Sequence, residues 1–196
     1  MQKFVEKYLA NFKDQNLNIF DIGSQNVTEF PEGSYKPLFE NSKWEYKGVD
    51  IVAGNNVDVV VSDIYNWKEI KSASANVVIS GQAFEHIEYT WATMLEITRI
   101  LKNNGLLCLV VPSSGPEHKY PIDCWRFFPD GLKSLAKYAN LEVIESYNCW
   151  NNPPIDGEIN EWKDSVLICK KQNFSFWQNL KFTLKRFLQK IILKLN

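Results

Sequence analysis

The sequence predicts an α/β fold, with a mostly parallel, seven-stranded sheet, helices on both faces and an antiparallel last strand. Short apolar, β-branched runs alternate along the chain with stretches of helical periodicity, which is typical of parallel sheets. The last two apolar runs follow each other without a helix between them, so they can pair antiparallel. A length of 196 residues favours one domain around a single core.

Seven runs are expected to form the strands. They cover residues 18–22, 46–50, 57–61, 76–80, 106–111, 141–147 and 165–169. The run at 106–111 is almost entirely aliphatic and precedes Pro112. That composition is typical of a strand buried on both faces at the centre of a sheet.

Helical periodicity defines the elements around these strands. Residues 2–13 and 88–101 both carry apolar side chains at the spacing of one helix face. Gly105 is expected to end the second of these helices as its C-terminal glycine. Asp130 is expected to cap a helix over 130–138.

Charge is distributed unevenly along the chain. The net charge is -1, yet residues 171–196 hold six basic side chains and no acid, which leaves -7 on residues 1–170. We therefore expect a domain over 1–170 and a basic amphipathic C-terminal helix over 171–196. An acidic domain argues against a nucleic-acid partner.

The C-terminal segment places large apolar side chains at helical spacing. They are Trp177, Leu180, Leu184, Phe187, Leu188, Ile191 and Leu195. A basic amphipathic helix of this kind can lie on an anionic membrane surface. The same stripe can instead dock on the domain or on a second subunit, and burial is slightly favoured because Phe182 interrupts the polar face.

The cysteines and the N-terminus indicate a cytoplasmic protein, which the C-terminal helix could hold at the inner face of the membrane. The four cysteines lack C-x-x-C spacing, as expected of free thiols in a reducing compartment. The first residues lack a signal-peptide core, and no run reaches the ~20 apolar residues of a membrane span. No metal site is expected.

Two strand ends indicate a nucleotide-like ligand. The first strand ends in Asp21, followed closely by Gly23, and the second ends in Asp50. The carboxyl ends of parallel strands form the crevice in which such ligands bind. Gly23 would let the backbone approach the ligand, and Asp50 would bind the two ribose hydroxyls.

Four segments together resemble the class I, type 11-like S-adenosylmethionine-dependent methyltransferases. They are residues 21–24 (DIGS), 48–50 (GVD), 80–87 (SGQAFEHI) and 99–105 (RILKNNG). The resemblance covers about residues 15–170 and implies a Rossmann-like fold with S-adenosylmethionine as cofactor.

Residues 112–127 resemble a subgroup found with bacterial surface-polysaccharide biosynthesis. The loop after the first strand carries one glycine where the family has two or three, which leaves a non-catalytic module as an alternative.

The resemblance assigns nine residues to the cofactor. They are Asp21 and Gly23 for its methionine end, Asp50 for the ribose, Asp63 and Ile64 for the adenine, Gln82 and Phe84 for the surroundings of the sulfonium, and Ser24 and Ile51 as further cofactor-binding residues. Asp63 could instead cap the turn that follows it.

The acceptor side is expected to hold the catalytic residues. His86 and His118 are the two histidines of the chain, and a histidine is the natural base for a hydroxyl acceptor near neutral pH. His86 could instead hold its loop. Five nearby residues are expected to bind substrate: Lys119, Tyr120, Asp123, Trp125 and Arg126. Arg126 suits a phosphate or carboxylate, or a structural salt bridge to Asp123 or Asp130, and Trp125 suits a sugar face or the core.

The expected function is methyl transfer to a small polar acceptor, by O-methylation of a sugar, sugar nucleotide or phosphorylated precursor of a surface glycan. The polar loop over 148–163 would overhang the acceptor as a lid. The alternatives are a non-catalytic module for partner or membrane association, or methylation of a lipid-linked glycan.

Overall fold

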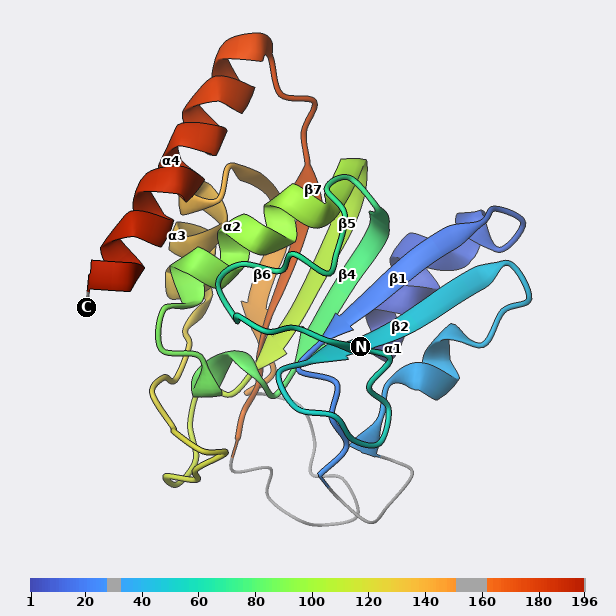
Figure 1. Cartoon of the computed structure of the whole chain (residues 1–196). Helices are drawn as coiled ribbons and strands as arrows, with labels where there is room; N and C mark the ends of the chain where they lie inside the picture. The colour runs from blue at the N-terminus through green and yellow to red at the C-terminus, as the bar shows by residue number, and fades with distance from the viewer. Residues whose placement is uncertain (28–32, 151–161, 196) are drawn as a thin grey trace.

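The computed structural model describes residues 1–27, 33–150 and 162–195 (Figure 1). A seven-stranded sheet has the order β3-β2-β1-β4-β5-β7-β6. The strands are β1 (Leu17–Ile22), β2 (Trp44–Asp50), β3 (Val59–Val60), β4 (Ala75–Gly81), β5 (Leu101–Val111), β6 (Leu141–Asn148) and β7 (Ser165–Lys171). The α-helices are α1 (Gln2–Phe4), α2 (Thr90–Ile100), α3 (Pro129–Tyr138) and α4 (Phe176–Leu195).

The pairing of the strands confirms the predicted sheet. β1 pairs in parallel with β2 and with β4, and β4 pairs in parallel with β5. β7 runs antiparallel to both β5 and β6. The carboxyl ends of the parallel strands therefore share one edge, where the expected ligand crevice lies.

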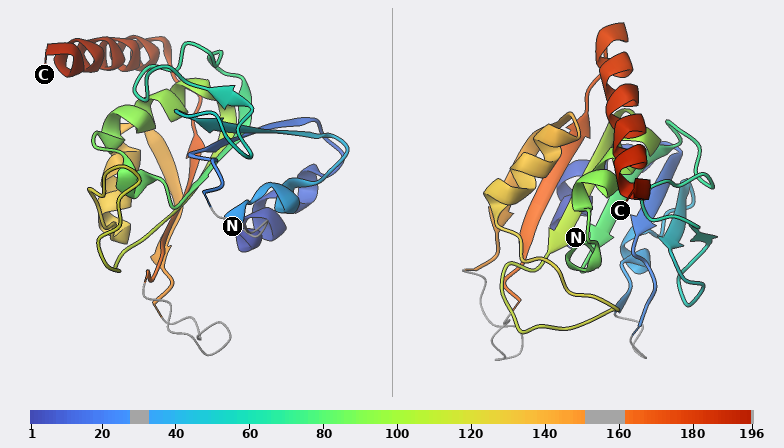
Figure 2. Two further views of the ribbon diagram at one scale, coloured as in Figure 1. Left: turned by 60° about the horizontal axis from the view of Figure 1, so that its bottom comes forward. Right: turned by 60° about the vertical axis from the view of Figure 1, so that its left-hand side comes forward.

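The sheet buries a different core on each face, because its side chains alternate between them. On β4, Val78 packs into the cluster that also holds Met94 and Leu132, from α2 and α3. Val77 and Ile79 pack on the other face, against Phe4 and other residues of the N-terminal segment. Figure 2 shows these two layers of helices on opposite sides of the sheet.

The predicted helix over 2–13 is helical but not uniform. It consists of α1, a π-helical segment, Val5–Leu9, and a 3-10 segment, Ala10–Phe12. A further 3-10 segment, Lys36–Phe39, lies between β1 and β2, and another, Phe84–His86, follows β4.

The predicted role of Gly105 as a helix terminator was wrong. α2 ends at Ile100 and β5 begins at the next residue. The backbone N–H groups of Ala73 and Ser74 donate to the carbonyls of Arg99 and Ile100, so the helix end is satisfied by another loop. Gly105 instead lies inside β5, where a Cβ atom would approach the carbonyl of Lys102 to 2.9 Å.

Two other boundaries differ from the predictions. Asp130 does not cap α3, because Pro129 takes the first helical position and Asp130 lies within the first turn, 3.0 Å from Lys133. β3 is shorter than the predicted 57–61, since the N–H of Val57 closes a turn onto the carbonyl of Gly54, 3.2 Å away.

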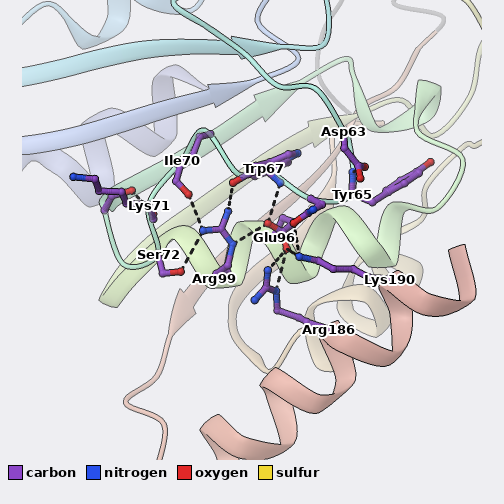
Figure 3. A network of polar contacts seen from close by, with 12 residues as sticks. Asp63, Tyr65, Trp67, Ile70, Lys71, Ser72, Glu96, Arg99, Arg186 and Lys190 are labelled. Carbon is purple, nitrogen blue, oxygen red and sulfur yellow. Dashed lines mark hydrogen bonds and ion pairs between the residues drawn. The ribbon is translucent and has the colours of Figure 1, made fainter. Parts of the chain in front are cut away.

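α4 packs on α2 through its polar face (Figure 3). Arg186 binds the buried carboxylate of Glu96, and Lys190 lies 3.9 Å from the same carboxylate. Phe182 is the buried apolar residue of the contact, and Lys185 donates to the carbonyl of Tyr138. The basic side chains of this helix thus attach it to the domain.

The apolar stripe of α4 faces solvent in the described structure. Its exposed members are Phe176, Trp177, Leu180, Leu184, Phe187, Leu188, Ile191 and Ile192. Docking on the domain therefore does not bury the stripe, contrary to the usual behaviour of amphipathic helices. Across the described residues, every helix is too short or too polar to cross a bilayer.

Candidate functional site

A pocket of about 650 Å³ opens at the carboxyl edge of the sheet. It is lined by residues from the loops after β1, β2, β3 and β4 and by residues 118–121. Nine of the sequence-predicted site residues lie in its wall: Gly23, Asp50, Ile51, Ile64, Gln82, His86, His118, Lys119 and Tyr120. The fold thus brings these nine residues, which lie far apart in the sequence, into the wall of one pocket.

Gly23 occupies a position that only glycine fits. Its φ is +73°, a left-handed conformation that costs other residues energy. An added Cβ would also lie 2.3 Å from the Cβ of Ala83. The single glycine of this loop is therefore the one at which the loops after β1 and β4 meet.

Asp50 lies at the end of β2 with its carboxylate held by backbone groups. One oxygen accepts from the N–H of Gln25 at 3.0 Å, and the other from the N–H of Ile51 at 2.7 Å. These bonds fix the side chain against the loop after β1, on the wall of the pocket. A carboxylate has four acceptor positions, so it keeps capacity for ligand hydroxyls.

The region expected to hold adenine is apolar. Ile64, Val61 and Trp67 line the pocket there. Asp63 is absent from the wall, and its carboxylate accepts from the N–H of Tyr65 at 2.8 Å. This is the turn-forming bond that the sequence left as an alternative role for Asp63.

Gln82 connects two parts of the rim. It has a φ of +53°, unusual for a residue other than glycine, and its side-chain amide donates to Asp164 at 2.9 Å. Burial raises the pKa of Asp164 above its usual range. Strained backbone of this kind often occurs at binding sites, and Gln82 is part of the pocket wall.

His86 and His118 lie side by side in the pocket wall. Their ring centroids are 4.7 Å apart and the rings are nearly perpendicular. Nδ1 of His86 lies 2.5 Å from the carbonyl oxygen of Ile122, so it carries the proton and leaves Nε2 as the acceptor. Burial lowers the pKa of His86, which favours the neutral form of its ring.

Glu85 lies behind the two histidines and is a site residue that the sequence analysis missed. Its Oε1 is 3.8 Å from Nε2 of His86 and 3.9 Å from Nε2 of His118. The side chain is fully buried, and burial raises its pKa to about 7. Glu85 belongs to the "EH" segment of the resemblance, which was the available signal.

Arg126 and Asp123 order the segment that carries His118. The guanidinium binds the carboxylate of Asp123 through two bonds, of 2.6 and 2.8 Å. Asp123 also accepts from the backbone N–H of His118 at 2.8 Å, and these bonds hold the pKa of its carboxyl well below the usual range. The structural pairing of Arg126 with Asp123 is therefore present, and neither residue lines the pocket.

Four other expected site residues lie outside the pocket wall. Trp125 donates from Nε1 to the carbonyl of Ile87 at 3.0 Å, Phe84 is buried in the core, and Ser24 donates to the carbonyl of Asn56 at 2.9 Å. Asp21 is buried behind the loop after β1. It accepts from the hydroxyl of Tyr46 at 2.5 Å, and burial raises its pKa to about 7.

Several wall residues had no signal in the sequence. They include Gln25, Val27, Val52, Trp67, Ala83, Ile87 and Pro121. Apolar residues of this kind are indistinguishable from core residues until the loops are placed. The proposed lid over 148–163 falls largely outside the described residues, although Trp162 stacks edge-on against His118 with centroids 4.6 Å apart.

Part of the chain matches a known domain family. A model of the methyltransferase domain family matches residues 31–109, which include β2, β3, β4 and the histidine-bearing loop after β4. No curated protein matches the chain.

Solved structures share the fold at low identity. SeMet-substituted CurJ carbon methyltransferase is 13% identical with a TM-score of 0.63, covering 88% of this chain and 54% of its own, so this chain spans about half its length. A second structure is the 1,6-didemethyltoxoflavin-N1-methyltransferase of Burkholderia thailandensis with bound 1,6-didemethyltoxoflavin and S-adenosylhomocysteine. It is 13% identical with a TM-score of 0.63, and the match covers 88% of this chain and 76% of that protein. The [4+2]-cyclase SpnF is 12% identical with a TM-score of 0.61, and the match covers 88% of this chain and 80% of that protein. A cyclase among these structures illustrates that the fold alone does not define a reaction.

The matched segment and the fold point to the same class of known proteins. Residues 31–109, fewer than half of the chain, match the methyltransferase domain, and S-adenosylmethionine is the cofactor that this match implies. The residues fit this group, because the wall offers a fixed carboxylate at Asp50 and an apolar slot at Ile64. The link to surface polysaccharides gains nothing from these matches and stays a proposal.

Proposed function

We propose that the protein transfers a methyl group from S-adenosylmethionine to a hydroxyl of a small polar acceptor. The observation that carries this proposal is the pair of histidines in the wall of the same pocket as Asp50 and Gly23. Cofactor and acceptor can therefore occupy one continuous cavity, which is what an in-line methyl transfer requires.

The cofactor would extend along the carboxyl ends of β1, β2 and β4. Asp50 would accept the ribose hydroxyls, and Ile64 would contact the adenine. Gly23 lets the backbone approach the methionine end, with Gln82 beside the sulfonium. Asp21 would act from behind this loop, since it does not line the pocket.

His86 is suited to take the acceptor proton. Its Nδ1 proton is held by the carbonyl of Ile122, so the lone pair of Nε2 is directed elsewhere. In the reaction the acceptor oxygen bonds to the methyl carbon, the carbon–sulfur bond breaks, and the hydroxyl proton moves to Nε2. His118 lies close enough to position the acceptor or to share this task.

Calorimetry with S-adenosylhomocysteine tests the cofactor assignment. We expect binding in the micromolar range, and Asp50→Asn should weaken it at least about tenfold, because one charge-assisted partner of the ribose is removed. Glu40→Gln, a change at an exposed glutamate remote from the pocket, is the matched control. Absence of binding at millimolar ligand would overturn the proposal and favour the non-catalytic alternative.

The acceptor is proposed to be a sugar, a sugar nucleotide or a phosphorylated precursor of a surface glycan. Lys119 supports an anionic acceptor, because it is a cation of the pocket wall and its ion pair with Glu117, at 3.3 Å, is exposed to solvent. Arg126, in contrast, is held by two bonds to Asp123. Tyr120 offers an exposed ring for a sugar face. A methyl-transfer screen of phosphorylated and unphosphorylated sugars should favour the former, and Lys119→Gln should remove that preference.

A second proposal concerns where the enzyme acts. The outward stripe of α4 carries eight large apolar side chains, with Lys181 and Lys194 exposed on the same helix and no acid from residue 171 onward. Two copies paired through α4 would bring these lysines together without any acid on the helix to balance them. An anionic membrane surface matches both the charge and the apolar band, and would place the enzyme near a lipid-linked glycan.

Sedimentation with vesicles of phosphatidylglycerol and phosphatidylcholine tests this second proposal. The intact protein should sediment with the vesicles, and Leu184→Glu with Leu188→Glu should abolish this, because both changes put acids into the apolar band. Asn179→Glu is the control for added charge alone. Failure of the intact protein to sediment, or dimerisation of the protein that depends on Leu184 and Leu188, would contradict membrane binding.

A further inference from the structure

Glu85, His86 and His118 form a compact group of metal-ligating side chains. One ligand atom from each lies within 4.8 Å of the others. Oε1 of Glu85 is the common neighbour, 3.8 Å from Nε2 of His86 and 3.9 Å from Nε2 of His118. Two imidazoles and one carboxylate thus converge on a single point.

The carboxylate of Glu85 lacks the partners that a buried carboxylate needs. Both of its oxygens are buried, and neither has a hydrogen-bond donor among the described residues. An isolated carboxylate removed from water is costly unless it is paired or binds a metal. The fold therefore maintains an acid here that is complete only with a further group.

Nε2 of both histidines lies on the side of Glu85. Nδ1 of His86 is held by the carbonyl of Ile122 at 2.5 Å. Nδ1 of His118 lies 3.4 Å from a carboxylate oxygen of Asp123 without forming a hydrogen bond to it. A carbonyl or carboxylate on the second ring nitrogen is the usual arrangement around metal-bound histidines. Arg126 in turn holds Asp123 in place.

We propose that Glu85, His86 and His118 bind a divalent cation of the first transition series, such as zinc or manganese. Imidazole and carboxylate ligands suit these ions. Ligands about 2.1 Å from a tetrahedral metal lie roughly 3.4 Å apart, so Glu85 needs to approach each histidine by roughly half an ångström. The two imidazole nitrogens, which lie within 4.8 Å of each other, need to close by up to about 1.4 Å. Because both histidines line the pocket, the remaining coordination positions open toward the acceptor.

The inference rests on the proposed function and changes the role of the histidines within it. A cation at this point binds the acceptor oxygen and acidifies its hydroxyl. The methyl carbon then leaves sulfur and bonds to that oxygen, while the hydroxyl proton passes to solvent through the open pocket. No oxidant or reductant is needed.

Zinc titration by calorimetry, without cofactor or acceptor, tests the site directly. The experiment uses the Cys124→Ser protein, because Cys124 is exposed and its backbone donates to the carbonyl of Glu85, which puts a competing thiol nearby. We expect one equivalent of zinc to bind with micromolar affinity or better. Glu85→Gln and His86→Ala should each weaken binding at least about tenfold, since each removes one of three ligands.

Glu40→Gln on the same background is the control and should bind zinc as tightly as its parent. Circular dichroism of the metal-free variants separates a lost ligand from a lost fold. No binding at about 100 μM zinc, or equal affinity in the folded Glu85→Gln variant, would overturn the metal site. If S-adenosylhomocysteine binds but zinc does not, the methyltransferase proposal stands with a histidine base. If zinc binds but S-adenosylhomocysteine does not, the metal site is supported and the methyl-transfer reaction is not.

Discussion

Glu85 and Glu96 are both buried glutamates, yet their surroundings differ completely. Glu96 is 1% exposed and accepts hydrogen bonds from the N–H of Trp67 and from Arg99 and Arg186. Glu85 is 0% exposed and accepts none from the described residues. A buried carboxylate with partners holds elements together, whereas one without partners is available for a ligand. The Glu96 region therefore stabilises the fold, whereas the Glu85 region is where we propose that the reaction takes place.

Activity at the Glu85 end should respond most strongly to mutation. His86→Ala should lower kcat by about 10²–10⁴-fold, because the group that accepts the proton or binds the metal is lost. Single-turnover methyl transfer measures this, with Glu40→Gln as control. Undiminished turnover in a His86→Ala, His118→Ala double variant would remove both histidines from the mechanism while leaving the enzyme class intact.

Stability at the Glu96 end should respond next. Glu96→Ala should lower the free energy of unfolding by about 3–5 kcal/mol, because Arg99 and the half-buried Arg186 lose their common partner. Urea unfolding gives this value. Below its melting temperature, the Glu96→Ala variant should bind S-adenosylhomocysteine as tightly as the wild type. A large loss of this affinity would mean that the Glu96 region and the pocket are coupled.

Asp21 is intermediate, with one hydrogen bond from Tyr46, and it makes stability depend on pH. Burial raises its pKa from 3.8 to about 7, so the folded state keeps a proton that the unfolded state releases between these values. Raising the pH through this range therefore destabilises the fold, by at most about 1.4 kcal/mol per pH unit. Unfolding at pH 5, 6, 7 and 8 should show a steeper loss in the wild type than in Asp21→Asn. Equal slopes would contradict this account.

The smallest effect is expected from Glu85→Gln on stability without metal. No hydrogen bond is lost and an unpaired acid is removed, so the free energy of unfolding should stay within about 1 kcal/mol of the wild type or increase. A loss as large as that of Glu96→Ala would show that Glu85 has a structural partner, and the contrast between the two residues would fail.

Much of the fold could be predicted because strand positions depend on local composition. The apolar and β-branched runs predicted all seven strands. Gly23, Asp50 and Ile64, which follow or end strands, line one pocket. The junction of α2 and β5 could not be predicted, because the carbonyls at the helix end are satisfied by Ala73 and Ser74 from another loop. A prediction that a glycine ends a helix uses only neighbouring residues, so it cannot include N–H donors from a distant loop.

The site was less predictable, since it depends on which polar groups find partners. Nothing in the order of residues 117–126 shows that Asp123 engages Arg126 and so leaves Lys119 as a cation of the wall. The orientation of α4 depends likewise on Glu96, whose attraction for Arg186 turns the basic face inward. Periodicity identifies the two faces of a helix but not the partner that selects between them.

The inward basic face of α4 also affects how the native protein opens. Its contact with the domain rests mainly on ionic and polar groups and on one buried ring, Phe182. Ionic contacts near a surface weaken with salt, whereas the apolar packing of α2 does not. Backbone amides of α4 should therefore exchange with deuterated solvent sooner than those of α2, and added salt should widen the difference. The C-terminal helix would then be a detachable unit whose release leaves the sheet and its pocket folded.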